Sequence, residues 1–213
     1  MTGIQTLLEI SSRDHSHICP RQVLGVRIGL AGLSALGFDA PPEKKRLLVI
    51  AETDGCFVDG LSAATRCTVG HRTLRVDDYG KIAAVFVDVI TGRAQRIAPA
   101  LDVRQRAAAF APDEPRHYFA QMRAYTEMPD DQLLNIQAVQ LTVSLESILS
   151  RPGLRVNCTV CGEEIINQRE IQLDGQVFCR ACAFEAQPWR FIYDDLQVPR
   201  NYRVIEACSS GLG

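Results

Sequence analysis

The chain has 213 residues and a mass of 23.5 kDa, with 46% hydrophobic and 23% charged residues, a composition typical of globular proteins. Its formal net charge of −2 argues against general nucleic-acid binding, which usually requires a large basic excess. The longest uncharged apolar-rich run, residues 28–38, is too short for a membrane span, which takes about 20 residues. No secretory signal is visible at the start, so we expect a cytoplasmic protein.

Helices and strands alternate irregularly along the first two thirds of the chain. Apolar residues at helical spacing predict a buried helix over residues 20–37, with Pro20 in its first turn and Gly37 at its end. We further expect strands at 46–53, 71–78 and 135–143, a β-hairpin over 81–100 that turns at Thr91-Gly92, and helices at 56–66, 102–110, 115–127 and 131–134. This mixture predicts an α+β fold with helices on a mainly antiparallel sheet.

Three glycines, Gly25, Gly29 and Gly32, lie on one side of the first long helix. Each costs about 1 kcal/mol relative to alanine in a helix interior. They therefore indicate close approach of another element, either a tight helix–sheet contact or a substrate groove.

The eight cysteines divide the chain into two parts. Three lie in the first third, four form two pairs near the C-terminus, and Cys208 lies in the tail. Because Pro152-Gly153 precede the paired cysteines, we expect a core domain over 1–152 and a small module with a tail over 153–213. In a cytosolic chain, this number of cysteines favours metal ligands or reactive thiols over disulfides.

The paired cysteines have the spacing of a Cys₄ zinc site: Cys158 and Cys161 are separated by 17 residues from Cys179 and Cys182. The order of cysteine knuckle, hairpin at Asp174-Gly175 and helix is similar to a treble-clef zinc finger. Four protein ligands leave no open position, so the zinc would be structural. Two disulfides, a redox pair and an iron–sulfur cluster are the alternatives.

A second group of metal-type ligands lies in the core region. His17 and Cys19 directly precede the first long helix, and Cys56 begins another helix with Asp59 one turn later. We expect His17, Cys19 and Cys56 to converge on a second metal ion with an open coordination position. Thiols at helix N-termini should have a lowered pKa. Each lone cysteine could instead be a small buried hydrophobe.

Two further features of this region concern its geometry. Asp59 or Glu52 would accept a hydrogen bond from the second ring nitrogen of His17. Cys67 lies about 16 Å from Cys56 if the intervening residues are helical, so it would be structural, or would reach the site from a second protomer. His15 and His117 are interpreted as exposed residues.

The chain contains several short motifs in this order: HSHICP, GVRIG, CFVD after Glu52, and CTVG followed by DYGKIA. In the order of these motifs, the chain resembles the FmdE family of formylmethanofuran dehydrogenase over about residues 10–150. The chain departs from the family pattern at four positions: Ser16 and Arg21 replace glycines, Arg66 replaces a glycine and His71 a lysine. The resemblance implies an α+β core, a homodimer and a metal-linked Cys/His pocket that includes Cys67. Family members with an added C-terminal treble-clef finger exist.

Three functions are compatible with these features. The first is a metal-binding accessory protein of a larger oxidoreductase complex, whose molybdenum or tungsten pterin is held by other polypeptides of that complex. The second is an independent thiol- or metal-dependent enzyme of unknown small-molecule substrate, with Cys56 or Cys19 as nucleophile or ligand, His17 as base and Asp59 nearby. The third is a regulatory protein whose finger binds a partner; acidic residues offset its arginines, which argues against nucleic acid.

Overall fold

The computed structural model describes residues 3–13, 15–149 and 151–184. Contacts within the chain divide it into two compact units, Met1–Leu145 and Glu146–Gly213, and each is described by itself. The boundary expected from the sequence, between residues 152 and 153, lies a few residues later. Cys208 and the end of the helix expected after Cys182 lie outside the described residues.

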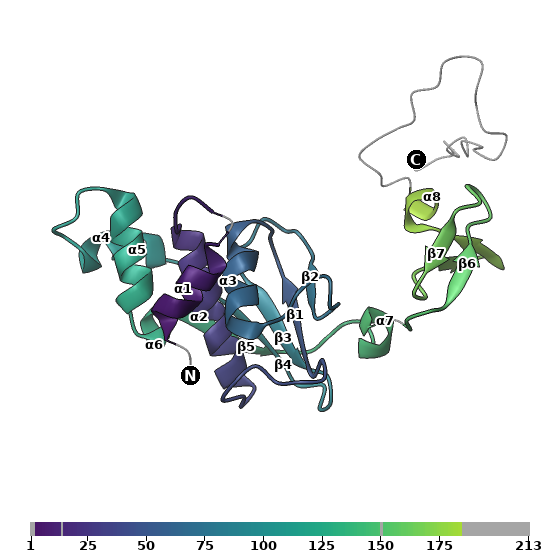
Figure 1. Cartoon of the computed structure of the whole chain (residues 1–213), viewed down its shortest axis with the longest axis horizontal. Helices are drawn as coiled ribbons and strands as arrows, with labels where there is room; N and C mark the ends of the chain where they lie inside the picture. Colours follow the sequence, from purple (N-terminus) through teal and green to yellow (C-terminus); the bar gives the residue numbers. More distant parts are fainter. Residues whose placement is uncertain (1–2, 14, 150, 185–213) are drawn as a thin grey trace, which may run out of the picture. The chain divides into compact units, whose positions relative to one another are not determined.

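The first unit is built on a five-stranded sheet with the strand order β2-β1-β3-β4-β5 (Figure 1). Three of its four strand pairs are antiparallel, and only β1 and β2 run parallel, because helix α3 (Cys56–Thr65) forms the crossover between them. The strands are β1 (Leu47–Ala51), β2 (Leu74–Val76), β3 (Ala84–Asp88), β4 (Ala94–Pro99) and β5 (Leu134–Val139). The predicted α+β class and mainly antiparallel sheet are confirmed.

Helix α2 packs between the sheet and α3, and α1 packs against α3. A hairpin of α4 and α5 lies beside α2. The helices of this unit are α1 (Ile4–Ser11), α2 (Pro20–Ala35), α3 (Cys56–Thr65), α4 (Val103–Phe110), α5 (His117–Glu127) and α6 (Asp130–Leu133), and α7 (Leu145–Leu149) begins at its end. The sequence predicted all of these except α1 and α7.

The glycines of α2 are explained by packing. A β-carbon on Gly25 would lie 2.2 Å from the carbonyl oxygen of Phe57 on α3, and one on Gly32 would lie 2.3 Å from the ring of Phe86 on β3. Gly60 of α3 is required by the same helix–helix contact as Gly25. A β-carbon on Gly60 would lie 2.4 Å from the carbonyl oxygen of Gln22 on α2. The close contact was predicted, but Gly25 meets a helix rather than a sheet. No substrate groove is needed to explain these residues.

The second unit contains two small hairpins followed by a short helix. Asp174 and Gly175 have φ values of 50° and 76°, and two successive positive φ angles are what a tight hairpin turn requires. The elements are β6 (Arg155–Asn157), β7 (Glu164–Ile166), β8 (Ile171–Leu173), β9 (Gln176–Phe178) and α8 (Arg180–Phe184). Cys158 and Cys161 therefore lie in the β6–β7 turn, and the second cysteine pair lies at the start of α8.

Candidate metal centre and core thiol pair

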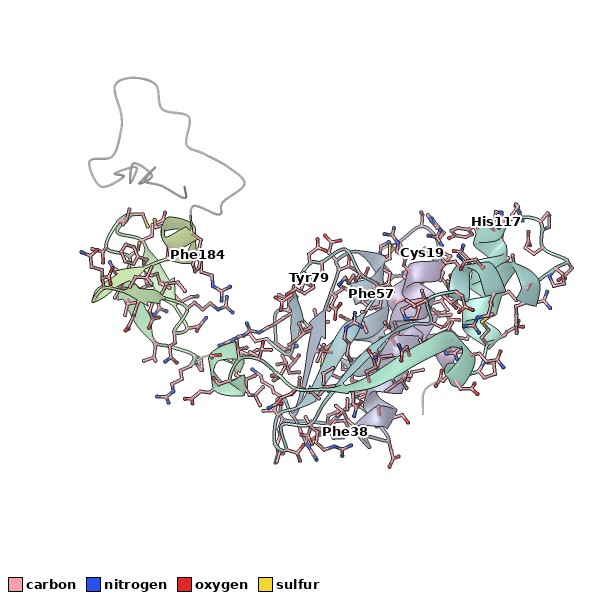
Figure 2. The ribbon with its side chains drawn as sticks, turned by 180° about the vertical axis from the view of Figure 1, so that it is seen from behind. Cys19, Phe38, Phe57, Tyr79, His117 and Phe184 are labelled. Atoms are coloured by element: carbon pink, nitrogen blue, oxygen red, sulfur yellow. The ribbon has the colours of Figure 1, made fainter. Side chains whose placement is uncertain are left out.

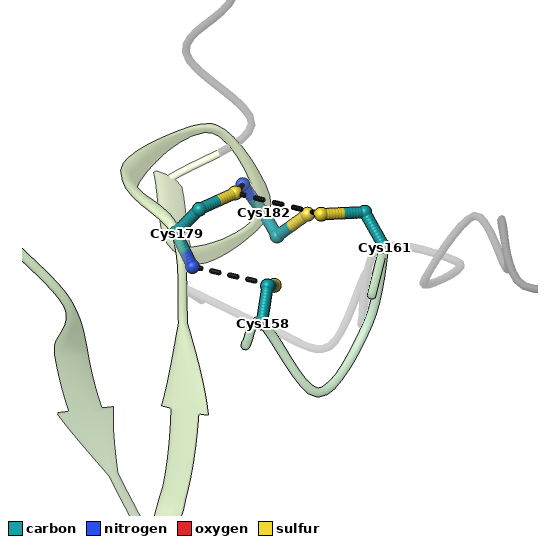
Figure 3. A group of neighbouring side chains, drawn as sticks. All are labelled: Cys158, Cys161, Cys179 and Cys182. Carbon is teal, nitrogen blue, oxygen red and sulfur yellow. Dashed lines mark hydrogen bonds between the residues drawn. The ribbon is translucent and has the colours of Figure 1, made fainter. Parts of the chain in front are cut away.

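Four cysteines of the second unit surround one point (Figure 3). The ligand atoms of Cys158, Cys161, Cys179 and Cys182 all lie within 4.8 Å of one another, and the Sγ atoms of Cys161 and Cys179 are 4.0 Å apart. A zinc–sulfur bond of about 2.3 Å gives tetrahedral sulfur–sulfur edges of about 3.8 Å. The donor set therefore fits a metal ion that prefers four thiolates.

Backbone geometry holds these sulfurs in place. Gly162, with φ 75°, donates its N–H to the carbonyl oxygen of Cys158 and closes the first knuckle. The N–H of Cys179 donates to Sγ of Cys158 at 3.3 Å, and the N–H of Cys182 donates to Sγ of Cys179 at 3.4 Å. Thr159 ties the knuckle to β9, since its N–H donates to the carbonyl oxygen of Val177. Such N–H···S bonds favour thiolates.

The thiols of this cluster differ in acidity. Although burial opposes ionisation, the backbone N–H groups of Cys161 and Cys179 lower the pKa of Cys158 to about 6. Burial and the neighbouring Cys158 raise the pKa of Cys161 to about 11. Burial and the other three thiols likewise raise the pKa of Cys182. A metal ion would have to displace protons from the less acidic members, so its binding should depend on pH.

The core carries a different arrangement, a pair of thiols where α2 and α3 begin. The Cys19 thiol lies close enough to Cys56 to raise the pKa of the Cys56 thiol, and both residues are partly buried. Cys19 is the residue that caps α2, and its N–H donates to Oε1 of Gln22 at 2.8 Å. Gln22 is fully buried and donates in turn to the carbonyl oxygen of Ser11, so it fixes the backbone that presents the Cys19 thiol.

Helix α5 also contributes a residue to the surroundings of the thiol pair. Figure 2 shows Cys19 and His117 at the same end of the helices, where α2 and α5 begin. The Tyr118 hydroxyl donates to the carbonyl oxygen of Ile18 at 2.6 Å. Partial burial of that hydroxyl, together with the nearby Cys19 and Cys56, raises the pKa of Tyr118. Sequence reasoning missed Tyr118, because nothing local connects a tyrosine to a cysteine 99 positions earlier.

His15 and His17 are both exposed, and each has a hydrogen-bond partner that the sequence did not predict. His15, interpreted as an exposed loop residue, has Nε2 2.9 Å from Oδ2 of Asp59 on α3. His17 is exposed, and its Nδ1 lies 2.9 Å from the Ser16 hydroxyl. Asp59, which we expected as an acceptor for His17, is paired with His15 in this structure.

Glu52, the other acceptor expected for His17, has a different partner. Its two carboxylate oxygens accept hydrogen bonds of 2.6 and 2.7 Å from Arg96 on β4. The Glu52 side chain is only 9% exposed, so this ion pair joins β4 to the end of β1. Glu52 is a structural residue in this fold.

The lowered pKa expected for the Cys56 thiol is not found, because its pKa is raised. Burial and the adjacent Cys19 thiol raise the pKa of Cys56, and they outweigh its own backbone N–H and the charge of Arg21. The N-terminus of α3 therefore does not produce a reactive thiolate unaided. A bound cation would supply the missing charge, because a metal ion deprotonates a coordinating thiol.

The remaining predicted ligand, Cys67, lies just beyond the other end of α3. It is 4% exposed, and its thiol donates to the carbonyl oxygen of Leu47 at 3.7 Å. Burial raises its pKa. Within the described residues, the four cysteines of the second unit are the only group of three or more Cys, His, Asp or Glu side chains that could share one metal ion. Cys19 and Cys56 thus form a two-ligand pair that neither His17 nor Cys67 completes within the chain.

The α+β core and its cysteine and histidine motifs place the chain in a defined family. Residues 15–138, more than half of the chain, match the family described as "FmdE, Molybdenum formylmethanofuran dehydrogenase operon". The chain belongs to the FmdE family. The resemblance found in the sequence is confirmed.

Two known proteins are similar to the chain. One is the crystal structure of a tungsten formylmethanofuran dehydrogenase FmdE-like protein from Syntrophus aciditrophicus, with 21% identity and a TM-score of 0.54 over 88% of this chain and 95% of that one. This likeness supports the fold. The other is a probable S-adenosyl-L-methionine-binding protein of Archaeoglobus fulgidus, 37% identical over 84 residues. The matched residues make up 38% of this chain and only 23% of the length of the relative.

Among the described residues, no helix has the length and apolar character to cross a membrane.

Proposed function

We propose that the chain is a metal-binding accessory protein of an oxidoreductase related to formylmethanofuran dehydrogenase. The proposal joins membership of the FmdE family to two clusters of thiols, one in each unit of the chain. In this proposal the second unit is a treble-clef finger stabilised by a structural zinc ion, and the core carries the working site. The protein would act in the cytoplasm as a homodimer or as part of the larger complex.

Zinc suits the four-cysteine cluster because all four donors are cysteine sulfurs within 4.8 Å of one another, and zinc binds four thiolates tetrahedrally. Among the described residues of this unit, only Cys158, Cys161 and Ile165 are buried hydrophobic members of its cluster. So small a core cannot offset the loss of chain entropy, and metal binding would supply the folding free energy.

The position of Cys19 and Cys56 side by side where α2 and α3 begin carries the proposal for the core. Two soft ligands held together by the starts of two helices would bind a borderline metal ion, with the positive ends of both helices favouring thiolates. The remaining ligands would come from a substrate, from a second protomer or from the exposed His17 after a movement of its loop. Coordination positions open to other ligands are what distinguish a working metal site from a structural one.

A second candidate is an independent enzyme that uses the same thiol pair. The observation that favours it is the Tyr118 hydroxyl beside Cys19 and Cys56, since a phenol in that position could donate a proton to a reacting group. His15 with Asp59 would supply a second proton carrier near the start of α3. In this alternative the role of base expected for His17 would pass to His15.

Metal analysis of the full-length protein, purified without oxygen, tests the proposal. Wild type should hold two metal equivalents per chain. Cys56→Ser and Cys161→Ser should each hold one, because each loses a different site. Cys67→Ala is the matched control and should keep both, because the Cys67 thiol is buried against the carbonyl oxygen of Leu47 and is closed to a metal ion in either protomer.

The outcomes separate the candidate functions. One equivalent in wild type that is lost only with Cys161→Ser would contradict the core metal site and favour a protein that uses its finger to bind a partner. Metal-free protein with either finger pair oxidised to a disulfide would contradict the zinc finger.

A further inference from the structure

A cavity of about 350 Å³ lies at the end of α2 and α3 that is remote from the thiol pair. It is enclosed by α1, the last turns of α2 and α3, and the loop at residues 37–41. Ser34 on its wall is 15 residues beyond Cys19, a separation of about 22 Å along a helix. The cavity is therefore distinct from the site proposed above.

The lining of the cavity is mainly apolar. Nine of its thirteen residues carry aliphatic, aromatic or proline side chains: Leu7, Ile10, Leu30, Leu33, Phe38, Ala40, Pro41, Ala63 and Ala64. Its volume falls at the small end of the range for small-molecule sites, about 300–1,000 Å³. An apolar chamber of this size suits the aliphatic or aromatic body of a small molecule.

Arg66 is the residue that gives the cavity a chemical preference. It lies at the end of α3 with φ 58°, a conformation that costs a non-glycine residue about 1 kcal/mol or more. Its exposed side chain has no ion pair or hydrogen bond with any residue in the described ranges. A guanidinium offers a planar set of donors that matches a carboxylate.

The surroundings add further positive charge. Arg93 lies 3.5 Å from the carbonyl oxygen of Ala35, at the end of α2, and so offsets the partial negative charge of that helix terminus. Arg46 stacks 4.9 Å above the ring of Phe38, which lines the cavity, and the Asp88 carboxylate balances its charge. Asp39 is the single acidic residue in the lining. Arg66 is therefore the positive group of the lining that remains available to an anionic ligand, since no described residue pairs with its side chain.

We propose that this cavity binds a small amphipathic carboxylate, with its apolar body among α1, α2 and α3 and its carboxylate paired with Arg66. The site is independent of the thiol pair and of any metal. It would give the core a second ligand at the opposite end of the same two helices.

Calorimetric titration with decanoate, below its micellar concentration, tests the proposal on the full-length protein. Decanol and decyltrimethylammonium provide the same apolar body with no charge and with a positive charge. Decanoate should bind at one site and more tightly than the other two. Arg66→Gln should weaken decanoate binding about two- to fivefold, which is the effect of an ion pair at an exposed guanidinium, and should leave decanol binding unchanged.

Three further variants separate binding from folding. Arg104→Gln removes an equal charge from the exposed face of α4 and should leave decanoate binding unchanged. Asp39→Asn should tighten binding, because it removes the one acidic group in the lining. Arg66→Gly should weaken binding while raising the unfolding temperature, since glycine tolerates the positive φ angle.

A last variant tests the location. Ala63→Phe should fill the chamber and abolish binding of both decanoate and decanol, while its unfolding temperature shows that the chain remains folded. Tighter binding of decyltrimethylammonium, unchanged affinity in Arg66→Gln, or no saturable binding of decanoate to wild type would each overturn the proposal. None of these results would change the metal content that tests the thiol pair.

Discussion

Arg27 secures the end of α5 against α2. Its guanidinium donates to the carbonyl oxygens of Tyr125, Thr126 and Met128 at 2.8, 3.0 and 2.5 Å, and it pairs with Asp130 at 2.7 Å. The side chain is only 11% exposed. These carbonyls belong to the last turn of the helix and to the residue that follows it, where intrahelical partners are absent.

Replacing Arg27 with methionine should therefore lower the free energy of unfolding by about 2–4 kcal/mol, because partly buried carbonyl groups lose their donors. Urea denaturation followed by circular dichroism measures the change. Arg104→Met on α4 removes an exposed arginine and should change stability by less than about 0.5 kcal/mol. Equal stability of the two variants would show that Arg27 contributes nothing beyond a surface charge.

Asp88 makes the stability of the core depend on acid. Two hydrogen bonds from Arg46, of 3.0 and 2.8 Å, hold the pKa of the 4% exposed Asp88 carboxyl well below its usual range. A lowered folded-state pKa contributes stability that is present above the unfolded value, about 3.9, and is lost as the pH falls toward the folded value. Asp88→Asn should therefore be less stable than wild type at pH 7, and the difference should shrink below about pH 4.

Urea midpoints measured from pH 7 to pH 2 test this pH dependence. Asp174→Asn, at an exposed hairpin turn, is the control and should follow the wild-type profile. A stability difference between Asp88→Asn and wild type that stays constant down to pH 2 would contradict the role assigned to the ion pair.

At the scale of elements, the contact between α2 and α3 determines where the two thiols lie. Gly25 and Gly60 let the helix backbones touch near the ends that carry Cys19 and Cys56. Gly60→Ala would place its β-carbon 2.4 Å from a backbone oxygen and 2.8 Å from a backbone nitrogen, neither of which can move alone.

Gly60→Ala should thus lower stability by about 1–3 kcal/mol, even though alanine favours a helix by about 1 kcal/mol. It should also lower the metal content of the core site, because the two helices move apart. Gly70→Ala is the control: no atom lies within 4 Å of its added β-carbon. Thermal unfolding measures the stability of both variants, and metal analysis measures their metal content. A Gly60→Ala protein as stable as wild type would show that the close contact between α2 and α3 does not require glycine at this position.

The elements that the sequence predicted are those with a strong local signal. The helix expected over 20–37 is observed as Pro20–Ala35, and the hairpin at Thr91-Gly92 is observed as β3 and β4. Helix α1 was missed because its eight residues have neither a side-chain cap nor an acidic first turn. The parallel pairing of β1 with β2 has no local signal either, since it depends on how α3 packs.

The candidate sites follow the same logic. The four cysteines of the second unit were predicted together because their spacing reports a single local structure. The pairing of His15 with Asp59, and the position of Tyr118 beside Ile18, join residues 44 and 100 positions apart. Contacts between residues so far apart in the sequence arise from tertiary packing. The thiols of the core site could therefore be predicted from the sequence, but the residues around them could not.

At the scale of the whole molecule, the two units should respond separately to loss of metal. The hydrophobic clusters of the two units share no residue. Cys161→Ser should therefore unfold the second unit alone. Hydrogen exchange should show the amides of β6 to β9 exchanging at nearly unprotected rates, while those of β1 and β3 stay protected as in wild type. Continued protection of β6 to β9 would mean that these hairpins fold without the metal.

The central claim is that the chain holds two separate thiolate metal sites, one in each unit. Anomalous X-ray scattering at the zinc edge, from crystals of full-length protein grown without added metal, tests it most directly. We expect one peak among Cys158, Cys161, Cys179 and Cys182 and a second beside Cys19 and Cys56. A single peak at the four cysteines, with Cys19 and Cys56 free or joined as a disulfide, would contradict it.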